Sequence, residues 1–212
     1  MHRLAGVRRV FIAWLALVLL LAGCAGAPPR DEIGALMREG QELFAAKRYD
    51  EAIARFRNVT ARDGNQWQAF LWLARAYTAK AAWTDAIAAG RRAYELSPGG
   101  QDVVPVFAEA LFGGGAEALR TSSFKAAIGH FTDYIRLQPS NARAYLNVGR
   151  AFLGDKRFAD ALGSLVKGLT LAAGPERAEF IRQLQEGGLA ALAQGEFSGA
   201  IGFLREYLKA DP

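Results

Sequence analysis

The chain has 212 residues, of which 51% are hydrophobic and 22% are charged, and this composition excludes a disordered protein. The formal net charge of +5 at first suggests an anionic partner such as nucleic acid. Three of the 26 basic residues, Arg3, Arg8 and Arg9, lie in the first 23 residues, which hold no acidic residue. Without that segment 23 basic residues face 21 acidic ones, and the remaining charge of +2 gives no support to nucleic-acid binding.

The first residues have the layout of an export signal, with a basic start (MHRLAGVRR), an apolar run (VFIAWLALVLLLAG) and then small residues. LAGC at 21–24 resembles a bacterial lipobox, which implies a signal peptide over 1–23 and acylation, for example by palmitate, of Cys24. Two alternatives are cleavage after Ala27 and an uncleaved anchor over residues 10–27, which are at the lower limit for spanning a bilayer. All three place the rest of the chain outside the cytoplasm.

The lipid-bearing Cys24 is followed by a short linker, so that residues 24–32 connect the anchor to the body of the protein. Ala25 stands after the cysteine where bacterial lipoproteins of the inner membrane often have Asp, and by this resemblance we expect the outer membrane. Cys24 is the only cysteine of the chain, so the body must be held together by packing alone.

Five similar segments recur along the rest of the chain. Each begins with an aromatic residue and has Ala three residues later, followed by Ile or Leu: YDEAIARF (49–56), WTDAIAAG (83–90), FKAAIGHF (124–131), FADALGSL (158–165) and FSGAIGFL (197–204). The central alanines are spaced by 34, 41, 34 and 39 residues. A period of about 34 residues indicates an array in which each unit packs on its neighbours.

The residues before each segment repeat as well. Twelve positions before each central alanine stands a small residue: Gly40, Ala74, Gly115, Gly149 and Gly188. Apolar residues lie around each of them at helical spacing. Each unit is therefore predicted to be two helices joined by a short polar turn. The pattern resembles the tetratricopeptide repeat (TPR) family, which implies an all-α, right-handed α-solenoid of about five helix-turn-helix repeats. We expect the array over 33–212, with repeats at about 33–66, 67–100, 108–141, 142–175 and 181–212.

Two stretches interrupt this register. QDVVPVF (101–107) precedes the third repeat and about five residues within GPERAEF (174–180) precede the fifth, and we expect longer helices or loops at both places. The run Gly113–Gly115 lies in the first helix expected for the third repeat, where each extra glycine costs about 1 kcal/mol relative to alanine. The run marks either a close approach or a soft joint, and we favour the soft joint.

The body of the chain has few residues suited to catalysis, metal binding or phosphate binding. His130 is its one histidine, which we interpret as a partly buried packing residue, and no Cys or His cluster has the spacing of metal ligands. FGGGA at 112–116 lacks the Lys and Ser or Thr of a phosphate loop. Acidic residues at the expected helix starts favour the helix dipole. We therefore expect a binding protein, without enzymatic activity, cofactor or metal.

The TPR resemblance implies that the first helix of each repeat lines a concave groove through its second, fifth, ninth and twelfth residues. In this sequence those positions combine apolar residues with a few arginines: Met37, Gln41, Phe44, Gln68, Leu71, Arg75, Thr78, Glu109, Phe112, Leu119, Arg143, Leu146, Arg150 and Leu153. Such a groove suits an extended or helical peptide with apolar anchors and some negative charge. The alternative is that several of the apolar residues pack against neighbouring helices.

The last segment, FLREYLKADP (203–212), has no polar capping helix after it. We therefore expect Phe203, Leu204, Tyr207 and Leu208 to be partly uncovered and to form a surface for a partner or for self-association.

Together these features predict a lipid-anchored scaffold on the periplasmic face of the outer membrane. Its partners would be envelope proteins of pilus and secretin assembly, outer-membrane protein insertion or polysaccharide export. A second hypothesis is an adaptor that regulates a soluble periplasmic enzyme, such as a peptidoglycan hydrolase or protease. A third, cytoplasmic hypothesis requires that the first 23 residues are not an export signal.

Overall fold

The computed structural model describes residues 30–211 of the chain. The expected signal peptide, Cys24 and most of the linker lie outside the described residues. Within them ten α-helices follow one another and no strand occurs: α2 (Arg30–Ala45), α3 (Tyr49–Arg62), α4 (Trp67–Ala79), α5 (Trp83–Leu96), α6 (Val103–Arg120), α7 (Phe124–Leu137), α8 (Ala142–Gly154), α9 (Phe158–Leu171), α10 (Pro175–Ala193) and α11 (Phe197–Ala210).

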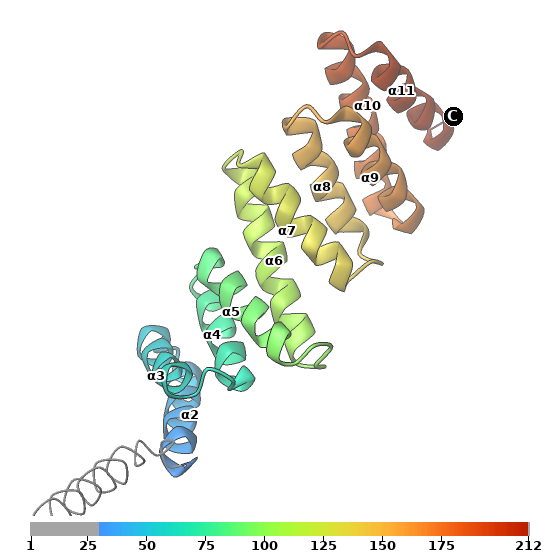
Figure 1. The fold of residues 1–212 in the computed structure, drawn as a ribbon. Helices are drawn as coiled ribbons and strands as arrows, with labels where there is room; N and C mark the ends of the chain where they lie inside the picture. The colour runs from blue at the N-terminus through green and yellow to red at the C-terminus, as the bar shows by residue number, and fades with distance from the viewer. Residues whose placement is uncertain (1–29, 212) are drawn as a thin grey trace, which may run out of the picture.

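The helices form five antiparallel pairs that stack into an elongated array (Figure 1). We call the first helix of each pair the A helix (α2, α4, α6, α8, α10) and the second the B helix (α3, α5, α7, α9, α11). Each B helix contacts its own A helix and, up to α9, also the A helix that follows. The predicted all-α solenoid of five helix pairs is therefore confirmed, with α2 and α11 at opposite ends (Figure 1).

Every A helix ends in the same three-residue turn. The middle residue of each turn has a positive φ of 55–77°: Lys47, Ala81, Ser122, Lys156 and Gly195. The next backbone N–H donates to the carbonyl five residues back, as from Arg48 to Leu43 (2.9 Å) and from Ala82 to Tyr77 (2.9 Å). This is the Schellman arrangement, which satisfies the last carbonyls of a helix and reverses the chain direction.

The small residues of the A helices are sites where side chains of the B helices pack. A Cβ added at Gly40 would lie 2.6 Å from the ring of Phe56, and one at Gly149 would lie 2.8 Å from Leu165. Phe56 and Leu165 are fully buried. The repeated small residue therefore lets an A helix and its B helix approach closely around one large side chain, which explains its recurrence in the sequence.

The two stretches that interrupt the 34-residue register lengthen A helices. α6 has 18 residues and α10 has 19, whereas α4 and α8 have 13 each. The extra residues are added at the start of the helix, before the part that pairs with the B helix. Of the two expected outcomes, longer helices or longer loops, the structure mainly shows longer helices.

The glycine run lies inside the continuous helix α6. A Cβ at Gly113 would overlap the indole of Trp83, one at Gly114 would lie 2.7 Å from Ile87, and one at Gly115 would lie 2.9 Å from Phe131. Each of the three glycines thus receives a different side chain from a neighbouring B helix. The close approach accounts for all three, and the run does not need the soft joint that we favoured.

Candidate interaction surfaces

The A helices form a continuous inner row along the array. Each A helix contacts the A helix of the next pair, whereas among the B helices only α9 and α11 contact each other. Helices on the inside of a curved stack lie closer together than those on the outside. We therefore call the surface formed by α2, α4, α6, α8 and α10 the inner face.

The expected groove residues differ in how open they are. Gln68, Glu109 and Arg143 are exposed. Most of the others are half-buried: Met37, Gln41, Phe44, Arg75, Thr78, Phe112, Leu119, Arg150 and Leu153. The inner face is therefore a partly filled surface in which polar side chains are the most accessible.

Leu71 and Leu146 are not on the open surface, contrary to our expectation. They are only 5% and 4% exposed. Leu71 belongs to the core cluster around Phe56, and Leu146 belongs to the cluster around Leu165 and Phe180. The fifth position of these A helices points into the seam between repeats, so there it stabilises the stack and is not available to a ligand.

Several half-buried aromatic residues of the inner face are also held by packing. The ring of Phe112 lies edge-on to Phe131 and to Tyr134, with centroids 5.5 and 5.1 Å apart. Phe44 contacts Trp72 in the same manner, and the guanidinium of Arg75 lies 4.8 Å from the centre of the Trp72 ring. These half-buried rings are therefore held by packing, and the Arg75 guanidinium, itself half-buried, lies against the Trp72 ring.

Arginines gather where α8 meets α10. Arg150 of α8 and Arg182 of α10 both form ion pairs with the carboxylate of Glu179. Burial, and next the positive charge of Arg182, lower the pKa of the Arg150 guanidinium, Glu186 opposes them, and Arg143 lowers this pKa further. Three arginines therefore share two carboxylates, those of Glu179 and Glu186, and a further carboxylate from a ligand would be stabilised there.

Sequence reasoning found Arg143 and Arg150 but missed Arg182 and Glu179. Groove positions were assigned in the first four repeats only, although Arg182 is the second residue of the fifth repeat as we placed it, at 181–212. Glu179 was missed because α10 begins at Pro175, before the expected start of that repeat. The acidic and basic residues of GPERAEF and the residues that follow are the signal that could have identified them.

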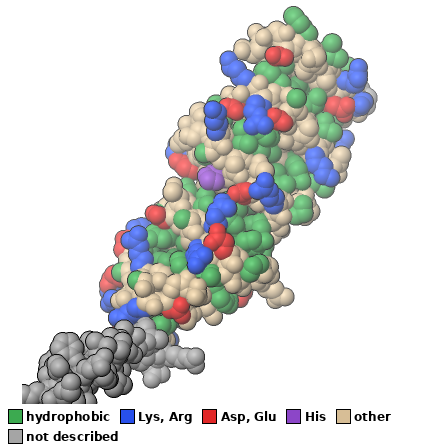
Figure 2. Space-filling view, in the orientation of Figure 1, with side chains coloured by type: hydrophobic (Ala, Val, Ile, Leu, Met, Phe, Trp, Pro, Cys, Tyr) green, Lys and Arg blue, Asp and Glu red, His purple; other side chains and the backbone are tan. Residues whose placement is uncertain are grey.

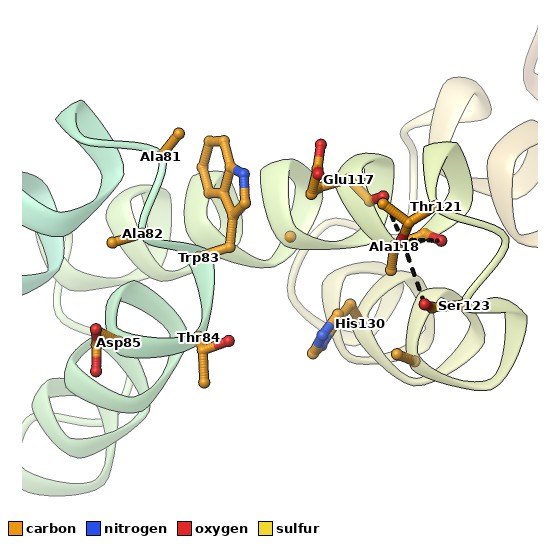
Figure 3. Close-up of a pocket in the computed structure, with 12 residues that line it drawn as sticks. Ala81, Ala82, Trp83, Thr84, Asp85, Glu117, Ala118, Thr121, Ser123 and His130 are labelled. Carbon is orange, nitrogen blue, oxygen red and sulfur yellow. Dashed lines mark hydrogen bonds between the residues drawn. The ribbon is translucent and has the colours of Figure 1, made fainter.

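A hollow of about 500 Å³ lies between the second and third repeats. Figure 3 shows that its lining side chains come from the turn before α5, from α5 itself, from the end of α6 and from α7, including Trp83, Asp85, Glu117 and His130. Glu117 is already paired with Arg120, at 2.5 Å. Burial lowers the pKa of the half-buried His130 imidazole, which favours its neutral form. The hollow is thus lined by polar and apolar residues in similar measure, with the indole of Trp83 among them.

The far end of the array exposes apolar side chains. All of the large hydrophobic residues that are exposed within residues 30–211 belong to α10 and α11: Leu189, Leu192, Phe197, Ile201 and Leu208. Of the four residues that we expected here, Leu208 is exposed, Leu204 and Tyr207 are half-buried, and Phe203 is fully buried. The expectation for Phe203 was wrong because its ring packs against Gly187.

The rest of the surface carries mixed charge. In Figure 2 lysines and arginines are interspersed with aspartates and glutamates along the visible face. Within residues 30–211, no three His, Cys, Asp or Glu side chains are grouped so as to hold a metal ion. None of the helices in that range combines the length and the apolar character needed to cross a membrane.

The comparison with protein families agrees with this architecture. The family model described as tetratricopeptide repeat matches residues 37–100 and 112–178. The chain belongs to the tetratricopeptide repeat family. TPR proteins are generally non-catalytic scaffolds, and the fold implies protein partners. No curated protein matches the sequence.

Solved structures share the TPR fold with this chain. A MamA protein is 22% identical, covers 85% of this chain and 92% of its own, and gives a TM-score of 0.54. MamA from Desulfovibrio magneticus RS-1 is 17% identical, with coverages of 85% and 96% and a TM-score of 0.50. YrrB, described as a TPR protein with an unusual peptide-binding site, is 13% identical, covers 92% of each chain and gives a TM-score of 0.51.

Proposed function

We propose that this TPR protein is a lipid-anchored scaffold of the bacterial envelope that holds a segment of a protein partner against its inner face. The observation that carries the binding part is the excess of positive charge where α8 meets α10. Arg143 is exposed there, two helical turns from Arg150 on the same side of α8, and Arg182 of α10 shares the carboxylate of Glu179 with Arg150. A partner segment with acidic side chains would complete this cluster.

Apolar contacts would supply the second part of the recognition. Met37, Phe44 and Leu153 are half-buried on the inner face and keep part of their surface open. Met37 and Phe44 belong to α2 and Leu153 belongs to α8, so a segment with apolar side chains at these places and acidic residues near α8 and α10 matches this distribution. Bidentate pairing of an arginine with a carboxylate adds geometric specificity to such a contact.

The proposed anchor rests on LAGC at 21–24 and on the apolar run before it. Each buried methylene of a lipid chain contributes about 0.8 kcal/mol, and two chains suffice for stable anchoring. The array would then be confined to the periplasmic side of the outer membrane, where partners in the same membrane are held at high effective concentration. Partners of this kind include pilus and secretin, outer-membrane protein and polysaccharide-export machineries.

Affinity capture from solubilised membranes tests the binding site. Arg143→Glu reverses an exposed charge on the inner face, and Lys167→Glu makes the same change on an exposed position of the B helix α9. We expect partners that bind the inner face to be lost with Arg143→Glu and retained with Lys167→Glu. Identical recovery with both variants would contradict the proposed site. Recovery mainly of cell-wall hydrolases or proteases would favour the adaptor hypothesis over assembly.

Labelling and fractionation test the anchor. We expect labelled palmitate in the protein and its recovery with outer membranes, and expect both to disappear in Cys24→Ser. A Cys24→Ser protein that stays in the outer membrane would contradict lipid anchoring. An unlabelled wild-type protein in the cytoplasm would contradict the envelope assignment altogether.

A further inference from the structure

The outer surface of α11 corresponds to a surface that the other repeats bury. The first, fifth and twelfth residues of α9 are Phe158, Leu162 and Leu169, and each is buried or half-buried. The same positions of α11 hold Phe197, Ile201 and Leu208, which are 65%, 59% and 64% exposed. In α9 these residues meet the neighbouring helix pair, so α11 presents a helix-packing surface that is uncovered in the described residues.

The apolar residues on this surface are arranged symmetrically along the helix. Phe197, Ile201, Leu204 and Leu208, which we call the C-terminal apolar stripe, are separated by four, three and four residues. This spacing is the same in both directions along the helix. It is also the alternating spacing of a and d positions in a coiled coil.

A second α11 running in the opposite direction fits this stripe. Phe197 would lie opposite the partner's Leu208, and Ile201 would lie opposite the partner's Leu204. The same two contacts recur on the other side of a two-fold axis, as an isologous interface requires. A shallow hollow of about 510 Å³, lined by Ile201, Leu204, Arg205, Leu208 and Lys209, provides room for the partner's side chains.

The charges around the stripe favour the same register. Lys209 is exposed and already pairs with Glu206 of its own helix at 2.6 Å, and the partner's exposed Glu196 would lie opposite it as a second carboxylate. Arg205 flanks the stripe and would face the partner's Ser198, so two like charges do not meet. The antiparallel register thus pairs opposite charges at the ends of the stripe and avoids repulsion in its centre.

The other end of the array does not offer a matching surface. Within residues 30–211 the exposed large hydrophobic residues are confined to α10 and α11, so the outer side of α2 presents none. A head-to-tail contact would therefore set an apolar stripe against a polar helix. Among the surfaces formed by residues 30–211, a second copy of the stripe is the one that complements it.

We propose that two copies of this protein pair through their fifth repeats, with α11 packed antiparallel against the partner's α11 around a two-fold axis. This pairing is independent of the ligand proposed for the inner face. It leaves the inner faces of both copies open.

Disulfide cross-linking in whole-cell lysates tests the register on the full chain, because the Cys24→Ser protein is expected to lack its membrane anchor. In a Cys24→Ser background, cells that co-express a Phe197→Cys chain and a differently tagged Leu208→Cys chain should give a mixed cross-linked dimer on mild oxidation. Either variant alone places its two cysteines 11 residues apart along the paired helices, or about 16 Å, beyond the reach of a disulfide. The Ala54→Cys variant has its cysteine at an exposed position of α3, and its cross-linking gives the background level due to random collision. Mixed dimers no more abundant than this background would overturn the proposal.

Sedimentation of the array gives a second, independent readout. The four core clusters lie entirely within α2 to α11, so residues 30–212 contain their own hydrophobic core. We expect a concentration-dependent equilibrium between monomer and dimer. Ile201→Glu should raise the dimer dissociation constant at least about tenfold, a loss of about 1.4 kcal/mol, whereas Ala54→Glu should not. An array that stays monomeric up to about 1 mM, a concentration at which even weak contacts of about 4 kcal/mol are seen, would overturn the pairing.

Discussion

Single glycines decide how closely the helices of this protein approach. Gly115 shows the effect most clearly, because a Cβ there would lie 2.9 Å from the fully buried Phe131 ring. In contrast, a Cβ at Gly129 on α7 would meet no atom within 4 Å. Replacing Gly115 or Gly129 by a larger residue should therefore have opposite effects on stability.

We predict that Gly115→Ala lowers the free energy of unfolding by about 1–3 kcal/mol, because the added methyl overpacks the site. Gly129→Ala should raise it by about 0.5–1 kcal/mol, because alanine costs less conformational entropy in a helix. Urea denaturation followed by circular dichroism measures both changes. A Gly115→Ala protein as stable as the wild type would show that Phe131 can move away without cost.

The half-buried His130 should make the stability of the protein depend on pH. Burial lowers the pKa of its imidazole, and the nearby Arg91 adds to this effect, while Asp133 opposes it. A histidine with a lowered pKa binds protons more readily when the chain is unfolded, so stability falls as pH drops below the ordinary value of about 6.5. We expect the urea midpoint to fall between pH 7.5 and pH 5.5, and to fall less in His130→Gln. An equal fall in both proteins would exclude His130 as the cause.

The turns between A and B helices are the most uniform elements of the array. Four of the five residues with positive φ in these turns are not glycine, and Ala81 (φ 55°) is one of them. A left-handed conformation costs an L-residue roughly 1–2 kcal/mol. The Schellman hydrogen bonds and the packing of both helices hold these residues in place.

We predict that Ala81→Gly raises the free energy of unfolding by about 0.5–1 kcal/mol, because glycine adopts this conformation without steric strain. Ala88→Gly, at an exposed interior position of α5, should lower it by about 1 kcal/mol. Thermal unfolding of the two variants compares the same substitution in two backbone conformations. Destabilisation by Ala81→Gly would mean that its methyl makes contacts worth more than the strain.

Helices and their pairing could be predicted from the sequence because the pattern is local and repeats five times. The inner face could be predicted only in part. Leu71 and Leu146 face the contact between neighbouring repeats. The position of that contact depends on how one repeat rotates against the next, and this rotation cannot be predicted from the sequence of a single repeat. Glu179 was missed because α10 begins at Pro175, before the start expected for the fifth repeat. At the far end Phe203 was mistaken for a surface residue, since the glycine that receives it is one position away from the expected Gly188.

Stability should vary along the stack of helix pairs. In a repeat array each unit is stabilised by its neighbours, and the last unit has only one. Among the described helices α11 contacts α9 and α10, whereas the central helix α7 is packed between α6 and α8. The fifth repeat should therefore open more readily than the third when it is not covered by a second copy.

We predict that amide hydrogens of α11 exchange faster than those of α7 in the monomeric Ile201→Glu variant, and that the difference narrows in the wild-type dimer. Hydrogen exchange measured by mass spectrometry on both proteins provides the comparison. Equal exchange rates in α7 and α11 of the monomer would contradict a stability that decreases toward the end of the array.

The connections on the two edges of the array differ in how they tolerate a change of length. Each turn from an A helix to its B helix has three residues, whereas the connections from a B helix to the next A helix have between three and six, and α6 and α10 are lengthened just after them. The additional residues thus lie along one edge of the array, where a B helix is followed by the next A helix. A reporter peptide inserted after Gly99 should leave the stack intact, while the same peptide after Ala81 should separate two helices that the turn holds in register. That edge is the natural place to attach probes or to splice in a further module.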